Sequence, residues 1–221
     1  MVEEPDVTTS ARIPFLPAMG RHGPLALYDP FTRLLGVRKQ HRRLIDQARL
    51  RPGEHVLDIG CGTGNLTILA AKQQSAATVV GLDPDPDVLN RAARKAGRAG
   101  LDITFDQGHA QALPYEDASF DTVLCALALH HVPEEHRMTA LREIGRVLTT
   151  GGILHVLEMA NGHSGGLAGR LVRHSPHGQA WGQVDVTHLM RQAGLSDPVE
   201  LDRTSNAVGS FAFYMAEKGG P

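Results

Sequence analysis

A short apolar strand, a glycine-rich turn and the start of a helix follow one another at residues 56–65, Val56-Leu57-Asp58-Ile59-Gly60-Cys61-Gly62-Thr63-Gly64-Asn65. Glycines allow a tight turn with positive φ, and they let a ligand touch bare backbone. The helix that follows offers free N–H groups and a partial positive charge to a carboxylate or a phosphate. We therefore expect a ligand site beyond the carboxyl ends of a parallel sheet, where the strand order reverses.

Asp83 ends the next predicted strand, 19 residues after Gly64. A carboxylate at that place can accept hydrogen bonds from both hydroxyls of an adenosine ribose. A dinucleotide fingerprint, G-x-G-x-x-G, would need a further glycine at Asn65 or at Thr67, and the chain has no G-x-x-x-x-G-K-S/T run for a P-loop. Since the Asp83 spacing also fits a dinucleotide fold, the loop alone leaves both ligands open.

Around this loop, apolar strands alternate with amphipathic helices. The pattern predicts strands at 55–59, 77–82, 102–107, 120–126, 152–158, 198–203 and 210–217, and helices at 24–36, 38–50, 65–73, 86–99, 134–148 and 187–193. Continuous apolar strands that alternate with helices indicate a parallel sheet covered on both faces. The predicted fold class is α/β, a Rossmann-like doubly wound sheet.

Composition excludes several classes of protein. The 221 residues fit one α/β domain, and a net charge of −2 gives no support to nucleic-acid binding. Two cysteines cannot make a disulfide framework, and no Cys/His pattern predicts a metal site. The chain has no apolar run long enough to span a membrane, and its acidic start does not read as a secretory signal. We expect a cytoplasmic protein.

Six segments in order resemble the motifs of the class I S-adenosylmethionine (SAM) dependent methyltransferases. They are Val56 to Gly64, Val80 to Asp83, Gly108 to Tyr115, Ser119 to Asp121, His130 to Val132 and Leu141 to Leu148. The resemblance is strongest to the small-molecule branch that includes ubiquinone/menaquinone-type methyltransferases. It implies a seven-stranded sheet with an antiparallel last strand, and SAM as the cofactor.

The resemblance also implies which residues hold SAM. Its methionine half would lie against Tyr28, Asp58, Gly60, Cys61, Gly62 and Gly64, its adenosine against Asp83, Pro84, His109 and Ala110, and its ammonium against the carbonyls of Cys125 and Ala126. His109 departs from the pattern, because the family usually has an acid there. A neutral imidazole accepts a hydrogen bond through one nitrogen only, so this contact with adenine is expected to be weaker or pH-dependent.

Three residues are candidates for catalysis. SAM carries an activated methyl group, so the protein mainly aligns the reactants, and a general base contributes where the acceptor must lose a proton. His130 and His131 follow the fourth strand and Glu158 ends the fifth, so all three are expected at the sheet edge that holds the methyl group. The alternative for the histidines is packing, or capping of the next helix.

The predicted organisation is one structural domain with two parts. Residues 1–50 would form an N-terminal arm and helices that act as a substrate lid, and residues 51–221 the SAM-binding domain, with an active-site insert at 160–186. Apolar and aromatic residues in the arm and the insert favour an apolar or aromatic small-molecule acceptor, methylated on oxygen or carbon. The alternatives are a non-catalytic SAM-binding or S-adenosylhomocysteine-binding regulator or scaffold, and, with least support, a nicotinamide oxidoreductase. The protein is expected to be a monomer or a homodimer.

Overall fold

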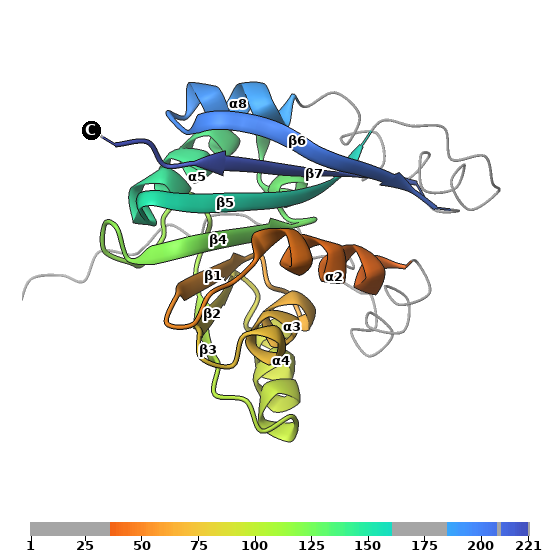
Figure 1. The fold of residues 1–221 in the computed structure, drawn as a ribbon. Helices are drawn as coiled ribbons and strands as arrows, with labels where there is room; N and C mark the ends of the chain where they lie inside the picture. Colours follow the sequence, from red (N-terminus) through yellow and green to blue (C-terminus); the bar gives the residue numbers. More distant parts are fainter. Residues whose placement is uncertain (1–35, 161–184, 207–208, 221) are drawn as a thin grey trace, which may run out of the picture.

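A computed structural model describes residues 36–160, 185–206 and 209–220 of the chain. One sheet contains seven strands in the order β3-β2-β1-β4-β5-β7-β6 (Figure 1). The strands are β1 (His55–Ile59), β2 (Thr78–Asp83), β3 (Thr104–Gln107), β4 (Phe120–Ala126), β5 (Leu148–Ala160), β6 (Ser196–Ser205) and β7 (Ser210–Glu217). Only β7 runs against its neighbours, β5 and β6. The α/β class and the antiparallel last strand are therefore confirmed.

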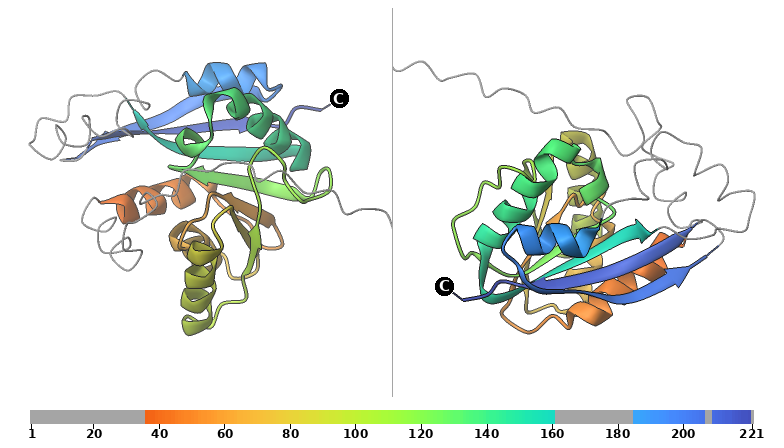
Figure 2. Two further views of the ribbon diagram at one scale, coloured as in Figure 1. Left: turned by 180° about the vertical axis from the view of Figure 1, so that it is seen from behind. Right: turned by 90° about the horizontal axis from the view of Figure 1, so that it is seen from above.

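Helices cover both faces of this sheet (Figure 2). They are α2 (Val37–Ala48), α3 (Asn65–Gln73), α4 (Pro86–Arg98), α5 (Glu134–Val147) and α8 (Val186–Gln192), with a 3₁₀ turn, η2 (Leu129–His131), between β4 and α5. Helix α4 shows why such elements form here. The carboxylate of Asp85 accepts from the backbone N–H of Asp87, and Pro86 takes the first helical position, where its missing N–H costs nothing.

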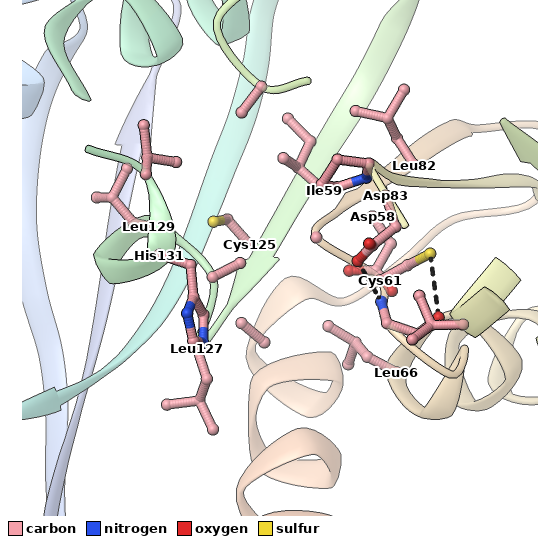
Figure 3. Close-up of a pocket in the computed structure, with 18 of the residues that line it drawn as sticks. Asp58, Ile59, Cys61, Leu66, Leu82, Asp83, Cys125, Leu127, Leu129 and His131 are labelled. Atoms are coloured by element: carbon pink, nitrogen blue, oxygen red, sulfur yellow. Dashed lines mark hydrogen bonds between the residues drawn. The ribbon is translucent and has the colours of Figure 1, made fainter. Parts of the chain in front are cut away.

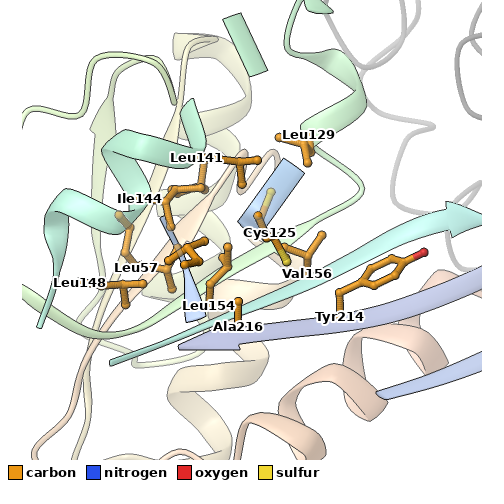
Figure 4. Close-up of a cluster of buried hydrophobic side chains, with 14 of the residues drawn as sticks. Leu57, Cys125, Leu129, Leu141, Ile144, Leu148, Leu154, Val156, Tyr214 and Ala216 are labelled. Atoms are coloured by element: carbon orange, nitrogen blue, oxygen red, sulfur yellow. The ribbon is translucent and has the colours of Figure 1, made fainter. Parts of the chain in front are cut away.

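Two apolar clusters hold the layers together. Figure 4 shows the first, in which Leu141 and Ile144 of α5 lie over Leu57, Cys125 and Val156 of the sheet. The second lies on the opposite face and packs α2 and α3 against β1, β4, β5 and β7. Strands buried on both faces explain why the sequence reads as continuous apolar runs rather than as an alternating pattern.

The strand order reverses between β1 and β4, so the carboxyl ends of these two strands open a crevice between the loops that leave them. The loop after β1 is the glycine-rich turn, and the segment after β4 leads into η2. This crevice is where the ligand site was predicted.

For the elements that the structure describes, the predicted bounds lie within two residues of those observed, except in β5. This strand begins at Leu148, ahead of the predicted residue 152, because Leu148 pairs with Phe120 before a shift in register. The predicted helix at 24–36 and the insert at 160–186 fall almost wholly outside the described residues. No helix in the described ranges has both the length and the apolar character needed to cross a membrane.

Candidate active site

The glycine-rich turn is fixed to the end of the neighbouring strand. The backbone N–H groups of Gly60 and Cys61 both donate to the carbonyl of Leu82, at 2.8 and 3.0 Å. Gly60 has a φ of 68°, and a Cβ there would lie 2.4 Å from the Cβ of Ala128. Only glycine can therefore hold the loop after β1 this close to the segment that follows β4.

A pocket opens between these two segments (Figure 3). The space between them, together with the open solvent at the mouth, amounts to about 1330 Å³. In Figure 3, Asp58, Cys61 and Asp83 lie on one side of the pocket, and Cys125, Leu127 and His131 lie on the other. The sequence-predicted residues that line it are Asp58, Gly60, Cys61, Gly62, Asp83, Pro84, His109, Ala110, Cys125, Ala126 and His131.

Two carboxyl groups, those of Asp58 and Asp83, line the pocket. Asp83 accepts from the N–H of Gly62 at 2.9 Å and from the N–H of Asp85 at 3.0 Å, so it joins the turn to the end of β2. Asp58 is 1% exposed and accepts from the hydroxyl of Thr67 at 2.6 Å. Each oxygen of a carboxylate has two lone pairs, so both groups keep capacity for a ligand.

Burial raises the pKa of both carboxyl groups. It raises the pKa of Asp58 to about 7, an effect that the Thr67 hydrogen bond opposes and the nearby Asp83 reinforces. Burial likewise raises the pKa of Asp83 to about 6, against the backbone hydrogen bonds from Asp85 and Gly62. The pocket is therefore suited to a ligand that brings positive charge or hydroxyl donors.

The predicted adenine end contains His109. Its side chain lines the pocket, and burial lowers its pKa, so the imidazole is neutral around pH 7. Its carbonyl accepts from the N–H of Ala112 at 3.0 Å, which fixes the turn after β3. The residue can thus offer one acceptor nitrogen where the family usually has a carboxylate.

The three catalytic candidates separate in the structure. Glu158 is 6% exposed, and its two oxygens are both engaged, one by the N–H of Leu129 at 2.9 Å and the other by Nδ1 of His130 at 3.0 Å. The ring of His131 lies 4.0 Å from that of His130. Of the three candidates, His131 alone lines the pocket, while Glu158 and His130 form a layer behind it.

Two other predicted cofactor residues are placed differently. Gly64 is absent from the pocket wall and precedes α3 with a φ of 74°, where a Cβ would lie 2.9 Å from the Cβ of Ala92. It serves the approach of α4 to the loop. Tyr28 lies outside the described residues, as do the apolar residues of the arm and the insert that suggested the acceptor.

The structure adds residues that sequence reasoning did not select. Val37 and His41 of α2 line the pocket, and burial, with a smaller contribution from the charge of Lys95, lowers the pKa of His41 to about 4. Leu127 also lines the pocket, with a φ of 55° that is unusual for leucine. A signal for the α2 residues was available, because 37, 41, 44 and 45 share one helical face.

Comparisons with known proteins agree with this geometry. Residues 56–152 match the model of a family described as a methyltransferase domain. The chain is 37% identical over 134 residues to a demethylmenaquinone methyltransferase of Thermus thermophilus. That match covers 59% of this chain and 60% of the relative, so the chain spans less than two thirds of the relative's length.

Solved structures share the fold at lower identity. A magnesium protoporphyrin IX methyltransferase from Synechocystis PCC 6803, solved with bound S-adenosylhomocysteine, has a TM-score of 0.69 and 19% identity and covers 84% of each chain. The cyclase SpnF has a TM-score of 0.68 and 23% identity, over 83% of this chain and 81% of its own. Residues 56–152 of this chain therefore match the kind of domain that the sequence motifs predict, a methyltransferase domain.

Proposed function

We propose that this protein is a SAM-dependent methyltransferase that acts on a small molecule. The observation that carries the proposal is the crevice at the reversal of strand order, where the glycine turn, Asp58 and Asp83 line one pocket. The two buried carboxyl groups with raised pKa values fit a ligand that carries an ammonium and a sulfonium. The methyltransferase family uses this cofactor.

The residues that would hold SAM follow from the pocket. Asp83 would accept from the ribose hydroxyls, His109 and Ala110 would meet the adenine, and the turn from Gly60 to Gly62 would hold the methionine half, since all of these residues line the pocket. When bound, SAM supplies a methyl group on a positively charged sulfur. The part of the protein is then to bind, orient and exclude water, which contributes about 7–11 kcal/mol in well-oriented reactions.

His131 is the candidate general base. It lines the pocket, and its ring lies against that of His130 at a tilt of 44°; His130 is in turn held by Glu158. An imidazole can take a proton from an acceptor hydroxyl or carbon acid near pH 7. Glu158 and His130 act through His131 and are positioning residues.

The acceptor proposed is an apolar or aromatic molecule methylated on oxygen or carbon. The described part of the pocket supports this, because its lining includes the apolar residues Leu127, Leu129, Val132, Ala140 and Ile144. The named activity of the Thermus relative, on demethylmenaquinone, makes hydroxylated naphthoquinols the first acceptors to try.

Binding and turnover are tested in sequence. Thermal unfolding is recorded alone, with S-adenosylhomocysteine and with NAD, because a ligand at 100 times its Kd stabilises by about 2.7 kcal/mol. A shift with S-adenosylhomocysteine alone is expected. Trideuteromethyl SAM is then incubated with a panel of quinols and phenols, and products are sought by their mass.

The outcomes separate the candidate functions. A labelled product that His131→Phe abolishes, with binding of S-adenosylhomocysteine retained, supports the proposal. Binding without turnover on any acceptor would favour a regulator or scaffold. A shift with NAD alone would overturn the cofactor assignment.

A further inference from the structure

A lysine from outside the glycine turn reaches into it. Lys95 belongs to α4, and its ammonium donates to the carbonyl of Thr63 at 2.8 Å and to Oδ1 of Asn65 at 2.6 Å. A third contact, 3.3 Å long, joins the same ammonium to the hydroxyl of Thr63. Hydrogen bonds from a charged donor are about twice as strong as neutral ones.

The contacts fall where the loop has most conformational freedom. Thr63 is 1% exposed and stands between Gly62, with a φ of 52°, and Gly64, with a φ of 74°. Two glycines that flank one residue leave its peptide groups little local constraint. By binding the carbonyl of Thr63, Lys95 determines which way the peptide groups of this segment face.

Both partners of Lys95 also belong to the pocket. Thr63 and Asn65 line it, and Asn65 is the first residue of α3. The charge of Lys95 therefore adds to the partial positive charge at that end of the helix. Its field extends to the α2 wall as well, because it contributes to the lowered pKa of His41.

The pocket is thus electrically asymmetric. Lys95 places positive charge beside Thr63 and Asn65, while Asp83 places negative charge beside Gly62, where the proposed function puts the ribose. A cofactor with a carboxylate at one end and hydroxyls at the other fits this asymmetry in one orientation only.

We propose that Lys95 is a positioning residue that orders the glycine turn from Gly62 to Asn65 and orients the amino-acid half of the cofactor. This inference rests on the proposed function and deepens it. It predicts that Lys95 matters for ligands that carry the amino-acid half and matters little for ligands that lack it.

The test compares two ligands in the full-length protein. S-adenosylhomocysteine contains the amino-acid half, and 5′-methylthioadenosine lacks it. For Lys95→Met, titration calorimetry should show S-adenosylhomocysteine binding weakened tenfold or more, and 5′-methylthioadenosine binding changed less than threefold. Lys95→Arg, which keeps the cation, should recover part of the loss.

Arg98→Met is the matched control. Arg98 is exposed and lies in the same last turn of α4, so this variant removes the same charge from the helix end without touching the loop. Neither ligand should bind differently to it. Lys95→Gln, measured in the same way, replaces Lys95→Met if that variant does not fold.

Other outcomes overturn one proposal or the other. Equal losses for both ligands, or no loss for either, would show that Lys95 does not orient the amino-acid half. A wild-type protein that binds neither ligand would instead overturn the proposed function itself.

Discussion

Gly60 and Gly62 both have positive φ, yet their surroundings differ. A Cβ on Gly60 would lie 2.4 Å from Ala128, whereas a Cβ on Gly62 would have no neighbour within 4 Å. Gly62→Ala should therefore lose only the left-handed penalty, about 1–2 kcal/mol. Gly60→Ala should lose more, because it also pushes η2 away from the loop.

Urea unfolding of the two variants measures this difference, with the slope checked to be constant. Gly60→Ala should unfold at the lower midpoint. Equal losses of stability would show that the close approach to Ala128 does not matter. Because the open space beside Gly62 is the cofactor pocket, Gly62→Ala should weaken S-adenosylhomocysteine binding despite its milder effect on folding.

The raised pKa values of Asp58 and Asp83 predict that SAM affinity depends on pH. Burial raises the pKa of Asp58 to about 7 and that of Asp83 to about 6, so both take up protons as pH falls through this range. A positively charged cofactor favours the ionised carboxylates and releases those protons. SAM affinity should therefore rise from pH 5.5 to pH 8 and then level off.

Calorimetry in two buffers of different ionisation enthalpy counts the released protons directly. Asp83→Asn should bind SAM more weakly and release fewer protons near pH 6. Affinity that is flat across this range in the wild-type protein would show that the ionised forms of Asp58 and Asp83 do not contribute to cofactor binding.

At the scale of elements, β5 controls the turn that follows β4. Glu158 of β5 is paired with the N–H of Leu129 and with Nδ1 of His130, so one buried side chain holds the first two residues of η2. Glu158→Ala would leave that N–H without a partner, at a cost of about 1–3 kcal/mol. It should also lower kcat for methyl transfer, because η2 carries His131.

S-adenosylhomocysteine affinity should change little in Glu158→Ala, since Glu158 does not line the pocket. Glu158→Gln keeps an acceptor for Leu129 and is the matched control, with a smaller loss of stability. A variant with unchanged kcat would contradict the positioning role of Glu158 and leave η2 held by its own backbone.

The elements differ in how far the sequence could predict them. The core strands β1 and β4 are mostly apolar and buried, and their predicted bounds are those observed. Lys95 could not be identified, because its role depends on α4 lying beside a loop that is 30 residues away in sequence. Glu158 was selected as a catalytic group, but its pairing with His130 depends on strand order, which its sequence position does not show.

At the scale of the molecule, the sheet separates two environments. One apolar cluster lies under α5 and α8 and the other under α2 and α3, and β5 also buries His155, whose Nδ1 has no hydrogen-bond partner among the described residues. The fold and its switch point follow from the strand pattern. The acceptor does not, because the residues selected for it lie in the arm and the insert rather than in the sheet.

His155 makes the stability of the whole molecule sensitive to acid. Burial lowers its pKa to about 4 from an ordinary value of 6.5. The contribution of this neutral imidazole to the free energy of unfolding is fully present above pH 6.5. It is lost as pH drops toward 4, because the unfolded chain binds the proton more readily than the folded protein. At pH 5 the loss amounts to about 2 kcal/mol.

His155→Leu removes this contribution at similar volume. Relative to that variant, the wild-type protein should lose stability between pH 7.5 and pH 5, as measured by urea unfolding at each pH. Asp58 and Asp83 change stability in the opposite direction, since their raised pKa values favour the folded state at low pH. Both proteins contain these carboxyl groups, so the difference between them isolates His155. Parallel pH profiles would mean that His155 gains solvent or a partner when it is protonated.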